Sequence, residues 1–390
     1  MLAILVFFLI PVVLIAITLT FARNIAIFWG VLTLTPLMSM YLGTFFLLLG
    51  SPEFVLSMQA SLIVSIMTFL PLLLIVTVFY FNPNMLVTTE CLGNEKIALE
   101  KQFEKLSAPV VVFFFILMGY SLLEMFQTGN FFRSYYTRAV GSNDTMLLLF
   151  TYTSGILAFC FCMMKKQRAL SLIVILCLLV LGKKHPVLFC VLLPVIWSLI
   201  YRRLNISRLI VISIGSFVLL YAIAIIFADG RDIPFFLQLA STFDYMINFQ
   251  YFLDTYPLGQ SGGDIFVTGF YKYYPRFFWV EKPEIYGFAL IHSSIYADEI
   301  ANGFFPSVFE TYAIWLADFG YLGVIPYTIK CSLTLFIVLL KGLNKDYRLY
   351  IILGSVDIFS LFIFLFFKCI WVTGPRLLKN NFTMYRRGAN

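Results

Sequence analysis

The sequence has 390 residues, of which 61% are hydrophobic, 18% are aromatic and only 12% are charged, with a net charge of +7 and a mean hydropathy of +0.93. Soluble proteins draw about a quarter of their residues from Asp, Glu, Lys and Arg, so this composition excludes both a water-soluble and a disordered chain. The 27 Lys and Arg residues are too few and too dispersed for a nucleic-acid partner.

Long apolar runs predict an all-α, multi-pass membrane protein with about 10 (9–12) transmembrane helices, since a bilayer core requires roughly 20 apolar residues per helix. The first run begins at Leu2 with no basic segment before it, which favours a first span over a removable signal peptide. Pro71 is expected to kink its helix. The predicted spans are Leu2–Ala22, Ile25–Leu49, Phe54–Phe81, Ala108–Leu123, Met146–Met164, Ala169–Gly182, Val187–Tyr201, Leu209–Ala228, Phe319–Leu340 and Leu349–Val372.

Basic residues in short loops predict the orientation, because they are enriched on the cytoplasmic side. We expect three parts: an N-terminal bundle of about eight spans (1–228), one large periplasmic loop (229–306), and C-terminal spans with a basic tail (307–390). Ten spans would leave the tail cations outside, so either a span near Phe305 to Lys341 is miscounted or the tail violates the rule. The residues assigned to the cytoplasm are Arg23, Lys96, Lys101, Lys105, Lys165, Lys166, Arg168, Arg202, Arg203 and Arg208, and the tail cations are Arg376, Lys379, Arg386 and Arg387.

Two predicted spans, Ala169–Gly182 and Val187–Tyr201, are shorter than the roughly 20 residues that a bilayer core requires. Their shared turn carries Lys183, Lys184 and His185, which would lie at the depth of lipid headgroups, where a lipid phosphate lies. Intramembrane cations are a functional hypothesis by default. The alternative is that flanking residues complete two ordinary spans and the lysines extend toward water.

The segment 229–306 is much longer than the other loops and is rich in aromatic residues. Its basic residues are Arg231, Lys272, Arg276 and Lys282. The stretch from Tyr273 to Trp279 combines aromatic rings with a cation, a pairing that suits sugars, whose C–H faces rest on rings. Alternatively, the aromatics form an interfacial belt, or Pro234–Phe252 lies flat on the membrane as an amphipathic helix.

Familiar catalytic motifs are absent from the sequence: it has no P-loop, dinucleotide fingerprint, zinc-protease motif or D-x-D pair. Gly259–Gly263 matches G-x-S-x-G but lacks the strand-turn-helix context of a nucleophile, and we interpret it as a turn. With His185 and His292 the only histidines, no histidine-based metal cluster is expected. An ion pathway through Asp357, Lys330, Glu310 or Asp318 stays open, although no inverted repeat supports a transporter.

The order of these features resembles the O-antigen polymerase family, the repeat-unit polymerases of bacterial surface polysaccharide synthesis. The resemblance covers roughly Leu179 to Gly323. Lys184 stands where an arginine is usual in the family, so bidentate phosphate binding there is doubtful. The matching motifs are Leu181-Gly182-Lys183-Lys184-His185-Pro186, the string Tyr274-Pro275-Arg276-Phe277-Phe278-Trp279-Val280-Glu281-Lys282-Pro283, then Phe305-Pro306-Ser307-Val308-Phe309-Glu310 and Asp318-Phe319-Gly320-Tyr321-Leu322-Gly323.

The resemblance implies a metal- and nucleotide-independent glycosyltransferase of the bacterial inner membrane that joins oligosaccharide units carried on undecaprenyl pyrophosphate. No cofactor is expected, and a chain-length regulator protein is an open partner. Arg276 would stabilise the leaving pyrophosphate, and Glu310 or His292 would be the base. For Glu310 the alternative is a helix cap paired with Ser307, and for Arg276 it is a cation lying beneath Tyr274 and Trp279. Substrate binding would fall to Lys183, Lys184, His185, Arg231, Tyr274, Trp279 and Lys282.

Two other functions fit the same features. An O-antigen ligase also has a large late loop and would use a histidine there, which His292 could supply. A flippase or exporter of lipid-linked sugar would bind the same headgroup without forming a bond.

Overall fold

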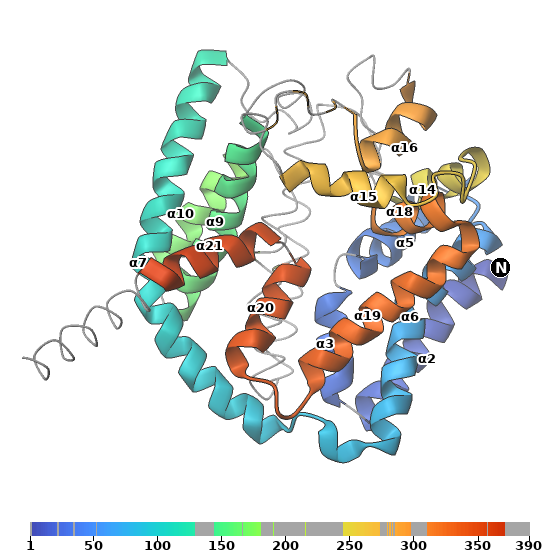
Figure 1. The fold of residues 1–390 in the computed structure, drawn as a ribbon, viewed down its shortest axis with the longest axis horizontal. Coiled ribbons are helices and arrows are strands. Elements are labelled where there is room, and N and C mark those ends of the chain that lie inside the picture. The colour runs from blue at the N-terminus through green and yellow to red at the C-terminus, as the bar shows by residue number, and fades with distance from the viewer. Residues whose placement is uncertain are drawn as a thin grey trace, which may run out of the picture. The chain divides into compact units, whose positions relative to one another are not determined.

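The computed structural model describes residues 2–21, 23–33, 36–51, 53–128, 144–165, 167–180, 190, 215, 245–273, 279, 281, 283, 285–297, 310–356 and 358–370. These residues are helical apart from turns and one isolated backbone bridge between Leu86 and Leu340, which confirms the all-α prediction for this part of the chain (Figure 1). Four of the described helices are long and apolar enough to cross a membrane: Leu2–Leu19, Met58–Phe81, Cys91–Leu123 and Tyr312–Leu339. The larger predicted count of spans stays a prediction.

The chain divides into two compact units that are interleaved along the sequence. Unit 1 comprises Met1–Leu86 and Leu220–Gly342, and unit 2 comprises Val87–Leu219 and Leu343–Asn390. Each unit is therefore assembled from segments distant in sequence, and the large loop belongs to the same unit as the first spans.

The membrane helices of unit 1 pack around α6. Ser57 caps this helix by accepting a hydrogen bond from the Ala60 amide, and the helix continues through Pro71. Ile25–Leu49, predicted as one span, is described as α3, a π-helical turn and α5; Pro36, which lacks an amide proton, lies within this segment. The elements are α1 (Leu2–Ile4), η1 (Leu5–Leu9), α2 (Ile10–Phe21), α3 (Arg23–Leu32), η2 (Leu37–Leu42), α5 (Gly43–Gly50), α6 (Met58–Phe81), η3 (Pro83–Met85) and α19 (Val324–Leu339).

The described part of the large loop is folded. Helix α14 buries Met246, Phe249 and Phe252 and contacts α5 and α6, so it is a packed helix of unit 1. Of the run Pro234–Phe252 the structure describes residues 245–252, and these are helical. The remaining elements are α14 (Tyr245–Thr255), α15 (Asp264–Gly269), η4 (Phe270–Tyr273), α16 (Phe288–Ile295), α18 (Glu310–Phe319) and η5 (Gly320–Gly323).

Unit 2 is built on the 40-residue helix α7 (Thr89–Thr128), which packs against α9 (Asp144–Met164). The predicted loop with Lys96, Lys101 and Lys105 is wrong: these residues continue the helix N-terminal to the apolar run. The reason is that Glu and Lys are good helix formers and pair one turn apart, as Lys96 and Glu100 do at 3.6 Å.

Helix α9 packs against both α7 and α10 (Arg168–Val180) in unit 2. The rings of Phe103 and Phe161 are 5.3 Å apart at one end, and the hydroxyls of Ser121 and Thr151 are 3.5 Å apart farther along. Helices α7 and α9 are therefore antiparallel.

The predicted span Leu349–Val372 is not one continuous helix, because the chain forms two helices there, α20 (Lys345–Val356) and α21 (Ile358–Lys368). They contact each other, and α21 also contacts α7 and α9. Neither helix reaches the roughly 20 residues that a bilayer core requires.

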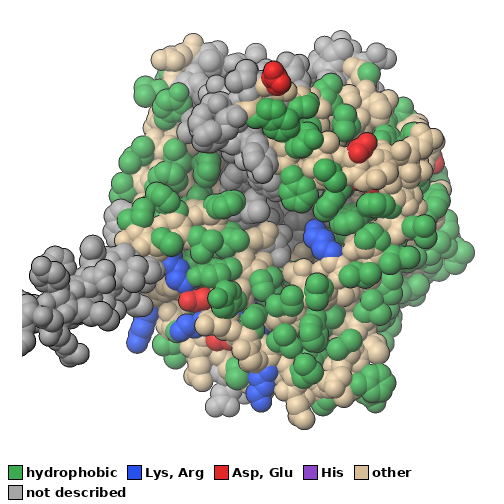
Figure 2. All heavy atoms as spheres, in the orientation of Figure 1, with side chains coloured by type: hydrophobic (Ala, Val, Ile, Leu, Met, Phe, Trp, Pro, Cys, Tyr) green, Lys and Arg blue, Asp and Glu red, His purple; other side chains and the backbone are tan. Residues whose placement is uncertain are grey.

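Apolar side chains cover much of the face shown in Figure 2, and charged side chains are sparse on it. Large exposed hydrophobics include Leu2, Val12, Ile116 and Leu322. A surface of this kind is typical of a protein solvated by lipid chains.

Candidate functional site

Most of the predicted site residues lie outside the described part of the chain. Glu310 is described only as the first residue of α18, without its side chain. Trp279 and His292 are described with their side chains. The structure therefore describes the elements on either side of the Tyr274–Pro283 motif, but not the cations Arg276 and Lys282 within it. The predicted residues outside them are Lys183, Lys184, His185, Arg231, Tyr274, Arg276 and Lys282.

The joint between the loop and the membrane is organised by Asp318, which is 1% exposed. Its Oδ1 accepts a hydrogen bond from the Ile265 amide at 3.1 Å, and its Oδ2 accepts one from the Phe266 amide at 2.7 Å. These amides belong to the first turn of α15, where helix geometry provides no partner for them. Charge-assisted bonds of this kind are strong. Asp318 therefore fixes α15 to the end of α18, which favours a structural role over a place in an ion pathway.

Two glycine turns meet at the same joint. The Gly259 amide donates to the carbonyls of Leu316 and Ala317 at 3.1 and 2.9 Å. Gly259 and Gly320 both have positive φ, +81° and +60°, and a Cβ on Gly259 would lie 3.1 Å from the Gly320 nitrogen. Only glycine allows both the conformation and this approach of backbones. The interpretation of Gly259–Gly263 as a turn is confirmed, and this turn is fastened to the Asp318-Phe319-Gly320 motif.

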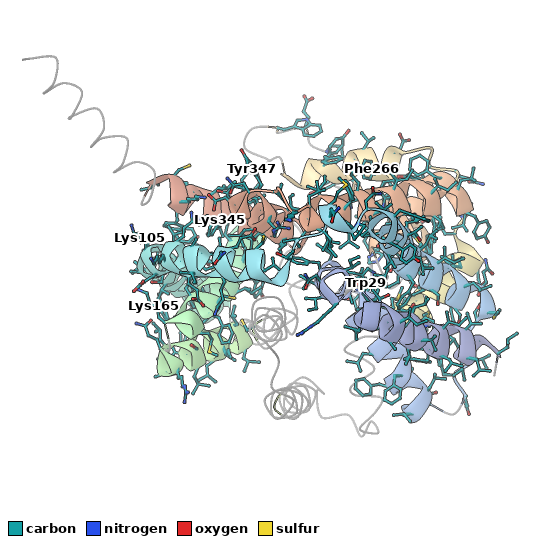
Figure 3. The ribbon with its side chains drawn as sticks, turned by 90° about the horizontal axis from the view of Figure 1, so that it is seen from below. Trp29, Lys105, Lys165, Phe266, Lys345 and Tyr347 are labelled. Atoms are coloured by element: carbon teal, nitrogen blue, oxygen red, sulfur yellow. The ribbon has the colours of Figure 1, made fainter. Side chains whose placement is uncertain are left out.

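Helix α18 is in turn anchored inside unit 1 by Tyr312, which is fully buried. Its hydroxyl lies 2.6 Å from the Thr68 hydroxyl of α6, and the Thr68 carbonyl accepts a 3.0 Å hydrogen bond from the Trp29 indole of α3. Trp29 is labelled in Figure 3. Glu310 lies two residues before Tyr312 in this anchored helix, at the predicted junction of loop and membrane.

Ring contacts join three aromatic residues in and beside the predicted aromatic and cationic string. The ring of Tyr271, in η4, lies 4.8 Å from that of Trp279 in an edge-to-face arrangement and 6.0 Å from that of Tyr286. Such aromatic pairs contribute about 0.5–1.5 kcal/mol beyond the area they bury. Tyr274 and Arg276 lie between Tyr271 and Trp279 in sequence. We define Tyr271, Trp279 and Tyr286 as the aromatic cluster of the loop.

His292 lies on α16 between two aromatic rings, 4.6 Å from Phe288 and 5.9 Å from Tyr296. Its Nε2 is buried and has no hydrogen-bond partner. Burial lowers the pKa of His292 from 6.5 to about 4, so the imidazole is neutral at physiological pH. An imidazole enclosed in this way fits a packing role better than the role of a base that must reach an acceptor hydroxyl.

Acidification is expected to destabilise the wild-type protein more than a His292→Phe variant. Between pH 6.5 and about 4 the unfolded state binds a proton at His292 that the folded state does not, so the stability present above pH 6.5 falls as pH is lowered through this range. Thermal unfolding in detergent at pH 7.5 and 4.5 would measure the difference between the two proteins. An equal loss in both would contradict the burial of a neutral imidazole.

Asp318 was placed in a family motif by the sequence, and its role as a cap was missed. The glycines at 259, 262, 263, 320 and 323 are the signal from which two turns beside it could have been predicted. Among the described residues, no group of three or more His, Cys, Asp and Glu side chains is arranged to bind a metal.

Comparisons with protein-family models, curated proteins and solved structures find no match to this chain, so the family resemblance rests on the sequence motifs alone.

Proposed function

We propose that this protein polymerises oligosaccharide repeat units carried on undecaprenyl pyrophosphate, at the periplasmic face of the bacterial inner membrane. The acceptor sugar's hydroxyl oxygen bonds to the anomeric carbon of the donor chain, and the bond from that carbon to the pyrophosphate breaks. The lipid pyrophosphate leaves with the electron pair, and the hydroxyl proton passes to a base. Because the donor is already activated, neither a nucleotide nor a metal is required.

The observation that carries the proposal is the support given to the Tyr274–Lys282 string. Tyr271, just before the string, contacts Trp279 within it and Tyr286 after it, and η4 follows directly on α15, whose first turn Asp318 holds. A loop fastened to apolar helices suits a lipid-linked sugar, because the lipid stays in the bilayer while the sugar lies outside it. Aromatic faces bind the C–H surfaces of sugars, and the cations of the string supply charge for the pyrophosphate.

The proposed division of roles follows from charge. Arg276 stabilises the negative charge that develops on the leaving pyrophosphate, since groups aimed at developing charge lower the barrier. Lys183, Lys184, Arg231 and Lys282 bind the lipid-linked substrate. Glu310 accepts the proton, because it begins the helix that leads from the loop into the membrane.

Replacement of Glu310 by Gln is expected to reduce polymerisation at least about 100-fold, because loss of a general base typically costs 10²–10⁴-fold in rate. Chain-length ladders on a gel measure the product. Asp254→Asn, which alters an exposed carboxylate of α14 outside the proposed site, is the matched control and should leave the ladder intact. Full polymerisation by Glu310→Gln would reduce Glu310 to a helix cap.

A strain lacking the gene distinguishes the proposed polymerase from its rivals. Core lipid capped with a single repeat unit indicates a polymerase. Uncapped core with polymer retained on the carrier indicates a ligase, and units trapped on the cytoplasmic face indicate a flippase. The enclosed Nε2 of His292 weighs against the ligase, for which a reactive loop histidine would be expected.

A further inference from the structure

The two helices that replace the last predicted span fold back on each other. Asp346, at the start of α20, and Lys368, at the end of α21, form an ion pair of 2.9 Å between Oδ2 and Nζ, across a separation of 22 residues. A continuous helix would place residues that far apart along the chain about 33 Å from each other. Two side chains cannot bridge such a distance, so the ion pair requires a reversal of the chain between them.

Other contacts follow the same antiparallel order. Near the tip, a Cβ on Gly354 would lie 3.2 Å from a side-chain carbon of Leu361, so α20 and α21 approach closely where a side chain is missing. Farther from the tip, the rings of Tyr350 and Phe364 are 6.2 Å apart. Lys368 also donates a hydrogen bond to the Tyr350 hydroxyl and lies 4.8 Å from the centre of its ring. Contacts made from tip to base define a helical hairpin, residues 345–368.

The base of this hairpin lies at the charged end of unit 2. Arg348, which is fully buried, donates from Nε to Glu95 Oε2 at 3.1 Å and from Nη2 to Oε1 at 3.4 Å, which ties α20 to the charged first half of α7. Breaking a buried pair of this kind leaves an uncompensated charge. The hairpin is therefore fastened to α7 by a buried ion pair in addition to its own.

Helix α21 crosses α7 where that helix changes from charged to apolar. The ring of Phe364 lies 5.7 Å from that of Phe103, and the ring of Phe367 lies 5.4 Å from that of Phe113. Lys105 lies between these two α7 residues in sequence, and Phe103 also contacts Phe161 near the end of α9. Figure 3 labels Lys105, Lys165 and Lys345, which come from α7, the residue after α9 and the start of α20.

We propose that α20 and α21 form a hairpin that does not cross the membrane and has both of its ends on the cytoplasmic side. The basic residues of α7, of the turn after α9 and of α20 then lie on one side, as the distribution of Lys and Arg in membrane proteins requires. The tail with Arg376, Lys379, Arg386 and Arg387 joins them there. The conflict between a ten-span topology and the basic tail disappears, because the hairpin does not cross.

Protease accessibility in the full-length protein tests on which side of the membrane the C-terminal tail lies. Recognition sites for a sequence-specific protease are inserted at Gly342, before the hairpin, at exposed Glu281 in the loop, and between Asn390 and an added epitope. With the protease expressed in the cytoplasm, cleavage is expected at Gly342 and after Asn390 but not at Glu281. Cleavage at Gly342 with protection after Asn390 would mean that the segment crosses the membrane, and would overturn the proposal.

Charge reversal tests whether α20 and α21 fold back on each other, whichever side of the membrane they lie on. Asp346→Lys and Lys368→Asp are each expected to lower the thermal midpoint in detergent, and the double variant should recover most of the loss. Failure of the double variant to recover would contradict the hairpin. Neither experiment depends on polymerase activity, so the hairpin and the proposed function can fail separately.

Discussion

Replacement of Arg276 by Ala is expected to abolish long-chain polymer while leaving lipid capped with a single repeat unit intact. The guanidinium is the cation of the string that we assign to the leaving pyrophosphate, and removal of one preorganised group that stabilises developing charge typically costs about 10²–10³-fold in rate. Silver-stained ladders from a complemented deletion strain, at equal protein expression, measure the outcome.

Two companion variants make the Arg276 experiment specific. Arg276→Lys retains the charge but cannot form a bidentate pair with a phosphate, so we expect intermediate activity with short chains. Lys341→Ala removes an exposed cation in the turn after α19 and should have no effect. Normal ladders from Arg276→Ala would remove this residue from the proposed mechanism.

Replacement of Asp318 by Ala is expected to release the loop from the membrane helices and to lower the free energy of unfolding by about 3 kcal/mol. The carboxylate is buried and binds two amides, and a hydrogen bond to a charged group contributes about 1.5–3 kcal/mol each. Thermal unfolding in detergent would detect the loss of stability. Limited proteolysis should show faster cleavage within residues 256–273, and polymerisation should fall with it.

The controls for Asp318 separate capping from general loss of charge. Asp318→Asn retains one oxygen acceptor and should show roughly half of the destabilisation. Asp254→Ala removes an exposed carboxylate from α14 of the same loop and should be neutral. Wild-type stability in Asp318→Ala would mean that the glycine turns hold the joint without the carboxylate.

The position of a turn could be predicted from the sequence, but the residues that pack against it could not. Gly259–Gly263 was interpreted correctly as a turn, because glycine is the residue that adopts positive φ without strain. Nothing in the local sequence indicated that Ala317, Asp318 and Gly320 would pack against this turn. Such a contact depends on where two helices end in space, and hydropathy carries no information about it.

Helix boundaries show the same limit. The apolar half of α7 was predicted as Ala108–Leu123, whereas the charged half was taken for a loop, because hydropathy detects a span and not a helix that continues into water. His292 was a candidate base by residue type, and only the position of its Nε2 between aromatic rings favours a packing role.

The sequence by itself determined the environment of this protein, since 61% hydrophobic residues with 12% charged ones can be solvated only by lipid, where backbone groups must pair within helices. It also located the few cations on which the proposed chemistry depends. Tertiary structure decided whether an apolar segment forms one long helix or two helices that fold back on each other. An apolar run after Leu349 satisfies a hydropathy threshold whether it forms one straight helix or two that fold back. The contacts between α20 and α21, among them the Asp346–Lys368 ion pair formed across 22 residues, show that the chain reverses there.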